Sequence, residues 1–272
     1  MKICLIFFSA TNNTRTISLE IKKELERIQN HTNVNLTDIT PFSNREKTLN
    51  LDKYEKFIFG FPVYGWNIPK VIRQWLKTID GNGRECAMFF TYGGINPGVV
   101  HFETTKLLSE QNFKVIASAE FVASHSYNLG GWKVLENRPD KEDFRTASIF
   151  TQKLLKRFQK KKSKQISFNS HKYSDKILKR IENNPKRFVN PPKIVNKCSF
   201  CSLCEEICPT NAIDIKKGFV DEKKCIRCLS CVLNCPEDVL KINDLNVLFD
   251  TVLQIEHLSR EKIKNRKSKI FL

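Results

Sequence analysis

Eight of the ten cysteines stand in two copies of one spacing, and this spacing is the strongest chemical signal in the chain. Residues 198–209 and 225–236 each read Cys-x2-Cys-x2-Cys-x3-Cys-Pro. Three closely spaced thiolates can hold three corners of a cubane iron–sulfur cluster, while the fourth cysteine of each copy ligates the neighbouring cluster. The spacing therefore predicts two [4Fe–4S] clusters. Cluster one takes Cys198, Cys201, Cys204 and Cys235, and cluster two takes Cys225, Cys228, Cys231 and Cys208.

Two other uses of cysteine fit this pattern less well. Structural zinc sites usually use two short pairs separated by a longer spacer, and disulfide frameworks are typical of small secreted proteins. Metal ligation by reduced thiols predicts a cytoplasmic protein. Cys4 and Cys86 lie inside apolar runs, and we expect them to be small buried core residues without a function.

A second group of chemically suggestive residues occupies segment 8–15, which is rich in hydroxyl and amide side chains and precedes a helix-period stretch. Backbone N–H groups at a helix N-terminus bind phosphate readily, so this loop is a candidate for a phosphate monoester. Ordinary helix capping by Ser9, Thr11 or Thr14 explains the same residues equally well.

Two further loops favour the ligand interpretation. Segments 61–67 and 91–94 carry aromatic residues and glycines, and each follows an apolar run. In a parallel sheet these loops would emerge at one edge, where open α/β sheets bind ligands. Each aromatic residue alone is better explained by packing, but three converging loops indicate a flavin. The candidate cofactor-binding residues are Ser9, Thr11, Asn12, Asn13, Thr14, Pro62, Tyr64, Trp66, Thr91, Tyr92, Gly93 and Gly94. His125, Ser126 and Tyr127 follow a fifth run and are further candidates for contact with the flavin, although a solvated loop is the commoner outcome for a histidine.

The elements that must position these loops can be outlined from periodicity. Apolar runs alternate with helix-period segments over the first 160 residues, which predicts βαβ units and a mostly parallel sheet covered on both faces. We expect strands at 3–8, 34–39, 57–63, 86–90 and 115–122, with 34–39 at an edge because its residues alternate. We expect helices at 17–28, at 69–79, after Pro97, and at 140–162. The start of the chain is expected to be a buried strand and not a signal peptide.

Composition divides the chain into four parts. Segment 163–195 shifts to Lys, Asn, Ser and Pro and is predicted to be a basic linker. The expected parts are a flavin-binding domain at 1–162, the linker at 163–195, a two-cluster domain at 196–245, and a basic tail, helical or frayed, at 246–272.

The net charge of +17 is concentrated in the second half of the chain. Residues 1–150 carry 19 basic and 16 acidic side chains, whereas residues 151–197 carry 15 basic and 2 acidic ones. Such a field favours acidic partners, anionic surfaces or nucleic acid, without choosing among them. Nucleic-acid binding would rest on this charge alone, because no recognised nucleic-acid fold accompanies it. No uncharged apolar run approaches the roughly 18–20 residues that a membrane span needs.

The cysteine repeat resembles the bacterial-type two-cluster ferredoxins. The similarity covers residues 196–244 and includes all eight cysteines together with Pro209 and Pro236. It implies a small α+β domain of short hairpins and helices around the clusters. It also implies one-electron transfer without bond making.

Residues 1–160 resemble the flavodoxin family, whose phosphate loop follows S/T-x-T-x-N-T. The resemblance implies an α/β, doubly wound parallel sheet of five strands in the order 2-1-3-4-5, and FMN as the cofactor. Ser9, Thr11, Asn13 and Thr14 would hold the phosphate, with Tyr64, Trp66 and Tyr92 beside the isoalloxazine. Ala10 and Asn12 stand where flavodoxins often have Gly, which bears on affinity for FMN.

The complete arrangement resembles the fused flavodoxin–ferredoxin proteins typical of anaerobes. It predicts electron transfer through two clusters and FMN, with an acidic ferredoxin, a flavodoxin or a reductase as partner. The alternative is a flavin-dependent reductase of the NAD(P)H or quinone type that uses the clusters as an internal relay. The sequence has neither a G-x-G-x-x-G motif after a strand nor an assembled nucleophile–His–acid set, so no catalytic residue is predicted.

Overall fold

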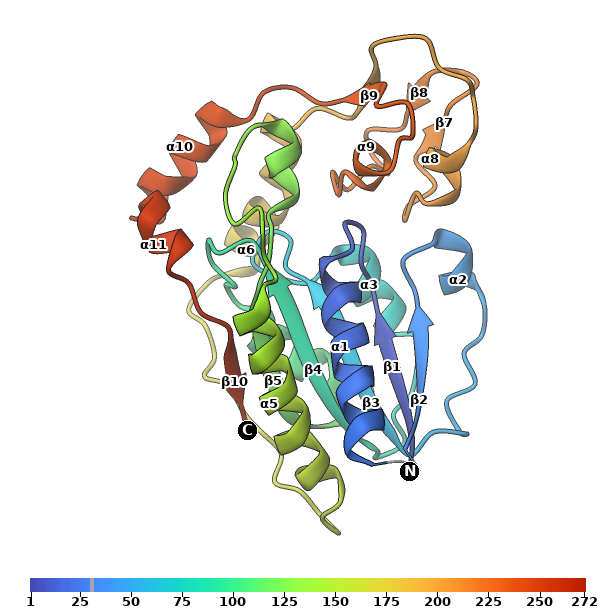
Figure 1. Ribbon diagram of the computed structural model, residues 1–272, viewed down its shortest axis with the longest axis vertical. Helices are drawn as coiled ribbons and strands as arrows, with labels where there is room; N and C mark the ends of the chain where they lie inside the picture. Colours follow the sequence, from blue (N-terminus) through green and yellow to red (C-terminus); the bar gives the residue numbers. More distant parts are fainter. Residues whose placement is uncertain (30–31) are drawn as a thin grey trace.

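The computed structural model describes residues 1–29 and 32–272 and is built around one twisted sheet (Figure 1). The strands lie in the order β10-β5-β4-β3-β1-β2. Neighbours among β1 to β5 pair in parallel, so the predicted order 2-1-3-4-5 is confirmed. The bounds of these strands are β1 (Lys2–Phe7), β2 (Asn33–Asp38), β3 (Lys56–Pro62), β4 (Glu85–Tyr92) and β5 (Lys114–Val122).

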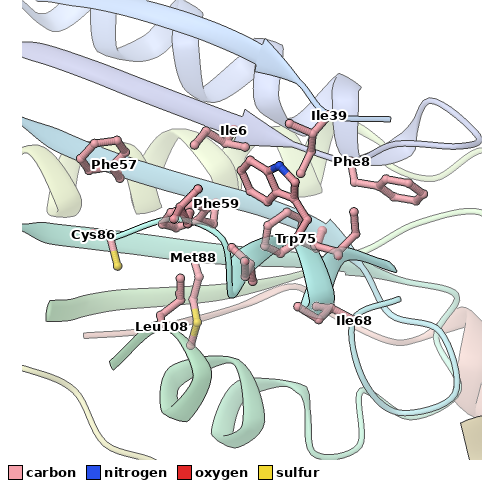
Figure 2. Close-up of a cluster of buried hydrophobic side chains, with 14 of the residues drawn as sticks. Ile6, Phe8, Ile39, Phe57, Phe59, Ile68, Trp75, Cys86, Met88 and Leu108 are labelled. Atoms are coloured by element: carbon pink, nitrogen blue, oxygen red, sulfur yellow. The ribbon is translucent and has the colours of Figure 1, made fainter. Parts of the chain in front are cut away.

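Helices cover both faces of the sheet. The helices α1 (Asn13–Ile28) and α5 (Lys141–Phe158) pack on one face, and α3 (Lys70–Leu76) and α4 (Val100–Glu110) pack on the other (Figure 1). Successive strand residues point to opposite faces, so strands covered on both sides are apolar almost throughout. In Figure 2, Phe59 and Met88 of adjacent strands lie near Trp75 of α3, within one of these two layers. The sheet therefore has a continuous apolar core on each side.

The helix starts follow local chemistry. Asp140 caps α5 with a capping box in which its carboxylate and that of Asp143 each accept a backbone N–H of the other. Pro69 directly precedes α3, and α4 begins at Val100, three residues after the proline that was expected to open it. The short α2 (Phe42–Glu46) follows β2.

The C-terminal tail returns to the sheet. After α10 (Asn246–Ile255) and α11 (Arg260–Lys264), the strand β10 (Lys269–Phe271) pairs antiparallel with β5. The Lys269 ammonium lies 3.0 Å from the buried Glu120 carboxylate of β5. The sheet thus has six strands where five were expected, and the end of the tail is an ordered edge strand and not a frayed one.

The segment expected to be a linker contains α6 (Asp175–Asn183), α7 (Pro185–Phe188) and β6 (Lys193–Ile194). Its first part lies along the sheet unit, the name used here for residues 1–162. The backbone N–H of Ile166 donates to the Val115 carbonyl at 2.9 Å, and Ile166 and Phe168 pack against the core. The carboxylate of Glu182 in α6 lies 2.5 Å from the Arg73 guanidinium of α3.

Residues 196–245, here called the cluster unit, lie above the carboxyl ends of the parallel strands (Figure 1). Their elements are short: α8 (Leu203–Glu206), β7 (Ile213–Asp214), β8 (Phe219–Val220), α9 (Ser230–Leu233) and β9 (Leu240–Lys241). β7 pairs with β8, and β9 pairs with β6. Within the described ranges 1–29 and 32–272, no helix is long and apolar enough to cross a membrane.

Candidate iron–sulfur and flavin site

The eight motif cysteines gather in the cluster unit. Cys204, Cys208 and Cys231 share one apolar cluster with the aliphatic side chains of β7 and β9. Three more of them, Cys198, Cys225 and Cys235, pack against the edge of this cluster. Cys4 and Cys86 are buried in the sheet unit, as predicted.

The four cysteines assigned to cluster two lie in one electrostatic neighbourhood. Burial, together with the nearby Cys225 and Cys208, raises the pKa of the Cys228 thiol to about 12. Burial also raises the pKa of Cys231, with Cys228, Cys225 and Cys208, and Cys204 of the first copy, acting in the same direction. Buried thiols that resist ionisation need a cationic partner to become ligands, and iron supplies that charge. These four side chains therefore fit a shared metal cluster.

The cluster-one cysteines are joined by a contact across the repeat. Burial raises the pKa of the Cys204 thiol to about 11, and Glu205 and Cys201 contribute to this shift. The segment that carries Cys235 reaches the first copy through Glu237, whose carboxylate accepts the Ser199 N–H at 3.0 Å. Among residues 1–29 and 32–272, no three metal-binding side chains converge on a site for a single ion. The observation that favours a cubane cluster is instead the backbone conformation of the two cysteine loops.

Left-handed backbone recurs at matching positions of the two copies. The pairs Phe200 and Arg227, Ser202 and Leu229, and Asn211 and Asp238 all have φ between 49° and 63°. Each non-glycine residue in this region costs of order 1–3 kcal/mol and persists where its surroundings over-determine it. Both cysteine loops are therefore wound in the same costly way, as expected for loops that wrap two equivalent cofactors.

A cavity of about 1030 Å³ opens between the carboxyl edge of the sheet and the cluster unit. Ligand sites commonly enclose about 300–1,000 Å³, so this cavity is large enough for a nucleotide cofactor. Ten of the twelve predicted cofactor-binding residues line it. The other two are Asn12, which precedes α1 with φ 65°, and Gly94, whose φ of 74° suits glycine.

The candidate phosphate loop, residues 9–14, is tied to its neighbours by its own side chains. The hydroxyls of Thr14 and Thr91 are 2.7 Å apart, and the Asn13 amide donates to the Ser124 carbonyl at 2.8 Å. Ser9 Oγ accepts the Arg15 N–H at 3.0 Å, so one predicted hydroxyl does serve the start of α1. The first turn of α1, residues 13–16, contains no Asp or Glu to neutralise its positive end, and Thr11, Asn13 and Thr14 at this end line the cavity. The loop suits an anion.

Aromatic side chains form much of the cavity wall. Tyr64, Trp66 and Tyr92 line it as predicted, and Tyr127 and Trp132 join them. Burial raises the pKa of Tyr92 to about 12 and raises that of Tyr64 well above its usual value, so both phenols stay neutral. Planar, uncharged walls of this kind accept a planar ring.

His125 lies at this wall and is not a solvated loop residue. Its ring centroid is 4.4 Å from that of Trp132, and burial lowers its pKa to about 4. A Cβ atom on Gly93 would lie 2.2 Å from the His125 ring, so only glycine allows the two loops to approach this closely.

The opposite wall of the cavity could not be foreseen from local sequence. It includes Thr210, Ile226 and Arg227 of the cluster unit, together with residues 181–186 and part of α10. Ile226 and Cys228 also belong to the core layer that contains Phe8 and Phe61 of the sheet unit. The Cys228 thiol is close enough to raise the Tyr64 pKa further. Cys228, which is predicted to ligate cluster two, therefore lies close to this wall.

Solved structures similar to the sheet unit include flavodoxins. A flavodoxin from the domain Archaea is 13% identical with a TM-score of 0.45, covering 59% of this chain and 100% of that one. Oxidised flavodoxin 2 from Bacillus cereus is 18% identical with a TM-score of 0.43, covering 57% and 99%. At such identities the likeness concerns the fold alone. The flavodoxin-like class rests on the strand order and helix placement described above, and with the cysteine loops it defines an electron-transfer iron–sulfur flavoprotein.

The cluster unit has relatives by sequence. A family model described as a 4Fe-4S dicluster domain matches residues 141–250. Ferredoxin-3 of Chlorobaculum tepidum is 36% identical over 56 residues, which span 18% of this chain and 90% of the relative. A ferredoxin-like protein in the nif region of Sinorhizobium fredii is 39% identical over 51 residues, spanning 16% and 80%. The chain belongs to the 4Fe-4S dicluster ferredoxin family, and joins this domain to a flavodoxin-like one.

Proposed function

We propose that this protein passes electrons between partner proteins through cluster one, cluster two and an FMN bound in the cavity. One observation carries the proposal: the same cavity is lined by the three predicted flavin loops on one side and by Ile226 and Arg227, beside the cluster-two ligands, on the other. A flavin held there would be next to cluster two. Such an arrangement suits transfer inside one chain.

The residues present fit FMN in both of its parts. Residues 9–14, at the positive end of α1, suit the phosphate. Tyr64, Trp66 and Tyr92 suit the ring, and the Thr14–Thr91 contact holds the first and third loops in register. When bound, FMN supplies the exchange between one-electron and two-electron transfer. The protein positions the cofactor and excludes water from it.

Cofactor content tests this proposal. Protein purified without oxygen should hold one FMN and about eight iron atoms per chain, four for each cluster. Thr11→Glu places a carboxylate in the phosphate loop and should abolish FMN binding while the iron content stays unchanged. Thr146→Glu on the outer face of α5 is the matched control and should keep both. A protein with full iron and no FMN at any added concentration would refute the flavin assignment.

The basic surface suggests the kind of partner. Residues 151–197 carry 15 basic and 2 acidic side chains, which favours docking of acidic redox proteins such as a ferredoxin or a flavodoxin. Exposed charges are screened beyond about 10 Å at 0.1 M salt, so the rate of electron exchange should fall as salt rises. Exchange with every acidic carrier at a rate independent of salt would refute this mode of docking.

The alternative, a flavin-dependent reductase, is separated by the choice of donor. Anaerobic protein is mixed in turn with NADH, NADPH and a reduced ferredoxin, and the absorbance of clusters and flavin is followed. The carrier function predicts rapid reduction by the ferredoxin alone. Rapid reduction by a nicotinamide would make the protein an enzyme.

A further inference from the structure

The two copies of the cysteine repeat match in their ligands but differ in charge. Shifting the first copy by 27 residues superposes all cysteines and both prolines, and it also superposes Lys197 on Lys224. Three carboxylates of the cluster-one surroundings have neutral counterparts in the cluster-two surroundings. The pairs are Glu205 with Val232, Glu206 with Leu233, and Glu237 with Thr210.

The carboxylates beside cluster one are held in place. Glu205 follows Cys204 directly, and its carboxylate accepts the Ile215 N–H at 2.7 Å. Glu237 accepts the N–H of Ser199, the residue after Cys198. Two of the three negative charges are therefore fixed next to cluster-one ligands.

A buried cation stands beside cluster two. Arg227 lies between Cys225 and Cys228, at the position that Phe200 occupies in the other copy, and it is only 4% exposed. Its guanidinium donates to the Val189 carbonyl at 2.8 Å and to the Cys225 carbonyl at 3.1 Å. Phe200 is more than half exposed.

The sheet unit supplies a second cation to the same cluster. The Arg45 guanidinium donates to the carbonyl of Pro209, the residue after Cys208. It is anchored by the carbonyls of Ile39, at 2.5 Å, and Thr40, at 2.8 Å. This contact places the Arg45 guanidinium one residue from Cys208, which is assigned to cluster two. Two positive charges, those of Arg227 and Arg45, are thus held beside cluster two, whereas carboxylates are held beside cluster one.

We infer that the two clusters have different reduction potentials, with cluster two the higher, so that an electron entering the pair settles next to the flavin cavity. This inference rests on the cofactors of the proposed function. Adding an electron makes a cluster more negative, so neighbouring cations favour reduction and neighbouring carboxylates oppose it. In the transfer, cluster one is oxidised as cluster two is reduced, and no atom moves.

The burial of the two clusters' ligands is consistent with the same order of electron transfer, from cluster one to cluster two. Cys201 of cluster one is exposed, whereas Cys228 of cluster two is buried against the sheet unit. Cluster one is therefore the outer station, where a partner delivers electrons, and cluster two is the inner one.

An anaerobic titration followed by electron paramagnetic resonance tests the inference, because each cluster becomes paramagnetic on one-electron reduction. The wild-type protein should show two separate midpoint potentials. Arg227→Gln should lower only the higher midpoint potential, that of cluster two. The expected change is about tenfold in the equilibrium constant for reduction, which is about 59 mV for one electron. The triple variant Glu205→Gln, Glu206→Gln, Glu237→Gln should raise the lower one alone.

The outcomes separate this inference from the proposed function. Two clusters at one shared potential, or a shift of the lower midpoint in Arg227→Gln, would overturn the inference and leave the function standing. Protein without eight iron atoms or without FMN would overturn the function itself. Where Arg227→Gln fails to load iron, the triple variant decides, because its substitutions are isosteric and lie at the outer cluster. No shift of the lower midpoint in that variant would overturn the inference.

Discussion

The sheet unit and the cluster unit keep their shapes in opposite ways. The sheet unit buries two layers of large side chains, including Phe57, Phe59 and Phe90 on one face and Phe89, Phe121 and Phe150 on the other. The apolar cluster of the cluster unit consists of a few aliphatic residues and the cysteines themselves. Its strands are two residues long.

The two units therefore draw their folding free energy from different sources. Burial of apolar surface contributes about 25 cal/mol per Å², so a double layer of aromatic side chains can stabilise the sheet unit without a cofactor. The left-handed loops of the cluster unit cost free energy, and the small apolar cluster of this unit offsets only a little of it. Metal binding must then supply most of its folding free energy.

Removal of iron should have the largest effect and should act on one unit only. After chelation under anaerobic conditions, we expect backbone amides of residues 198–242 to exchange rapidly with solvent, while those of β1 to β5 stay protected. Hydrogen exchange read by mass spectrometry measures both units in one sample. Equal protection in the two units of the iron-free protein would contradict this division.

A core substitution should act on the other unit. Phe59 is fully buried between β1 and β4, so Phe59→Ala should lower the free energy of unfolding of the sheet unit by roughly 3–5 kcal/mol. Phe219→Ala is the control, because Phe219 is 56% exposed and its loss should change stability by less than about 0.5 kcal/mol. Urea denaturation measures both. Similar losses in the two variants would show that the sheet core is not the main support.

The tail connects the two units and should influence the flavin. The guanidinium of Arg266 donates to the carbonyls of Gly94 and Ile95 at 3.1 Å each, so it anchors the third flavin loop. Arg266→Ala should weaken FMN binding about tenfold, or about 1.4 kcal/mol. Fluorescence titration with FMN measures this, with the exposed Lys267→Ala as the control. Unchanged affinity in Arg266→Ala would mean that the loop holds its shape without the tail.

Protonation of His125 should also affect stability. The pKa of His125 is about 4 in the folded protein, against about 6.5 for an unperturbed His, so the unfolded chain binds the proton more readily. Stability of the sheet unit should therefore fall as the pH drops from about 6.5 to about 4. His125→Gln should flatten this part of the profile. Urea midpoints over this pH range give the answer, and identical profiles in wild type and His125→Gln would contradict it.

Much of the fold could be predicted because its signals are local. Apolar runs such as 57–63 mark strands buried on both faces, and the cysteine spacing defines a loop whose chemistry is set by its own residues. The candidate phosphate loop and the aromatic residues Tyr64, Trp66 and Tyr92 could be placed at one cavity for the same reason, since each follows a strand that could be recognised.

The remaining features depend on contacts between distant residues. β10 is a three-residue strand in a basic tail, and only its pairing with β5 makes it a strand. Arg45 and Pro209 are 164 residues apart in the sequence, and no periodicity links them. The second wall of the cavity likewise comes from segments that carry no ligand motif of their own. Tertiary packing alone brings these residues together.

The most direct test follows clusters and flavin in the fully loaded protein after rapid anaerobic mixing with a reduced low-potential ferredoxin. We expect the cluster absorbance to change first, and the flavin to follow at a rate that does not depend on protein concentration, because the electron crosses from cluster two within one chain. A flavin rate that rises in proportion to protein concentration would contradict the internal relay. So would a flavin that is reduced equally fast in protein without clusters.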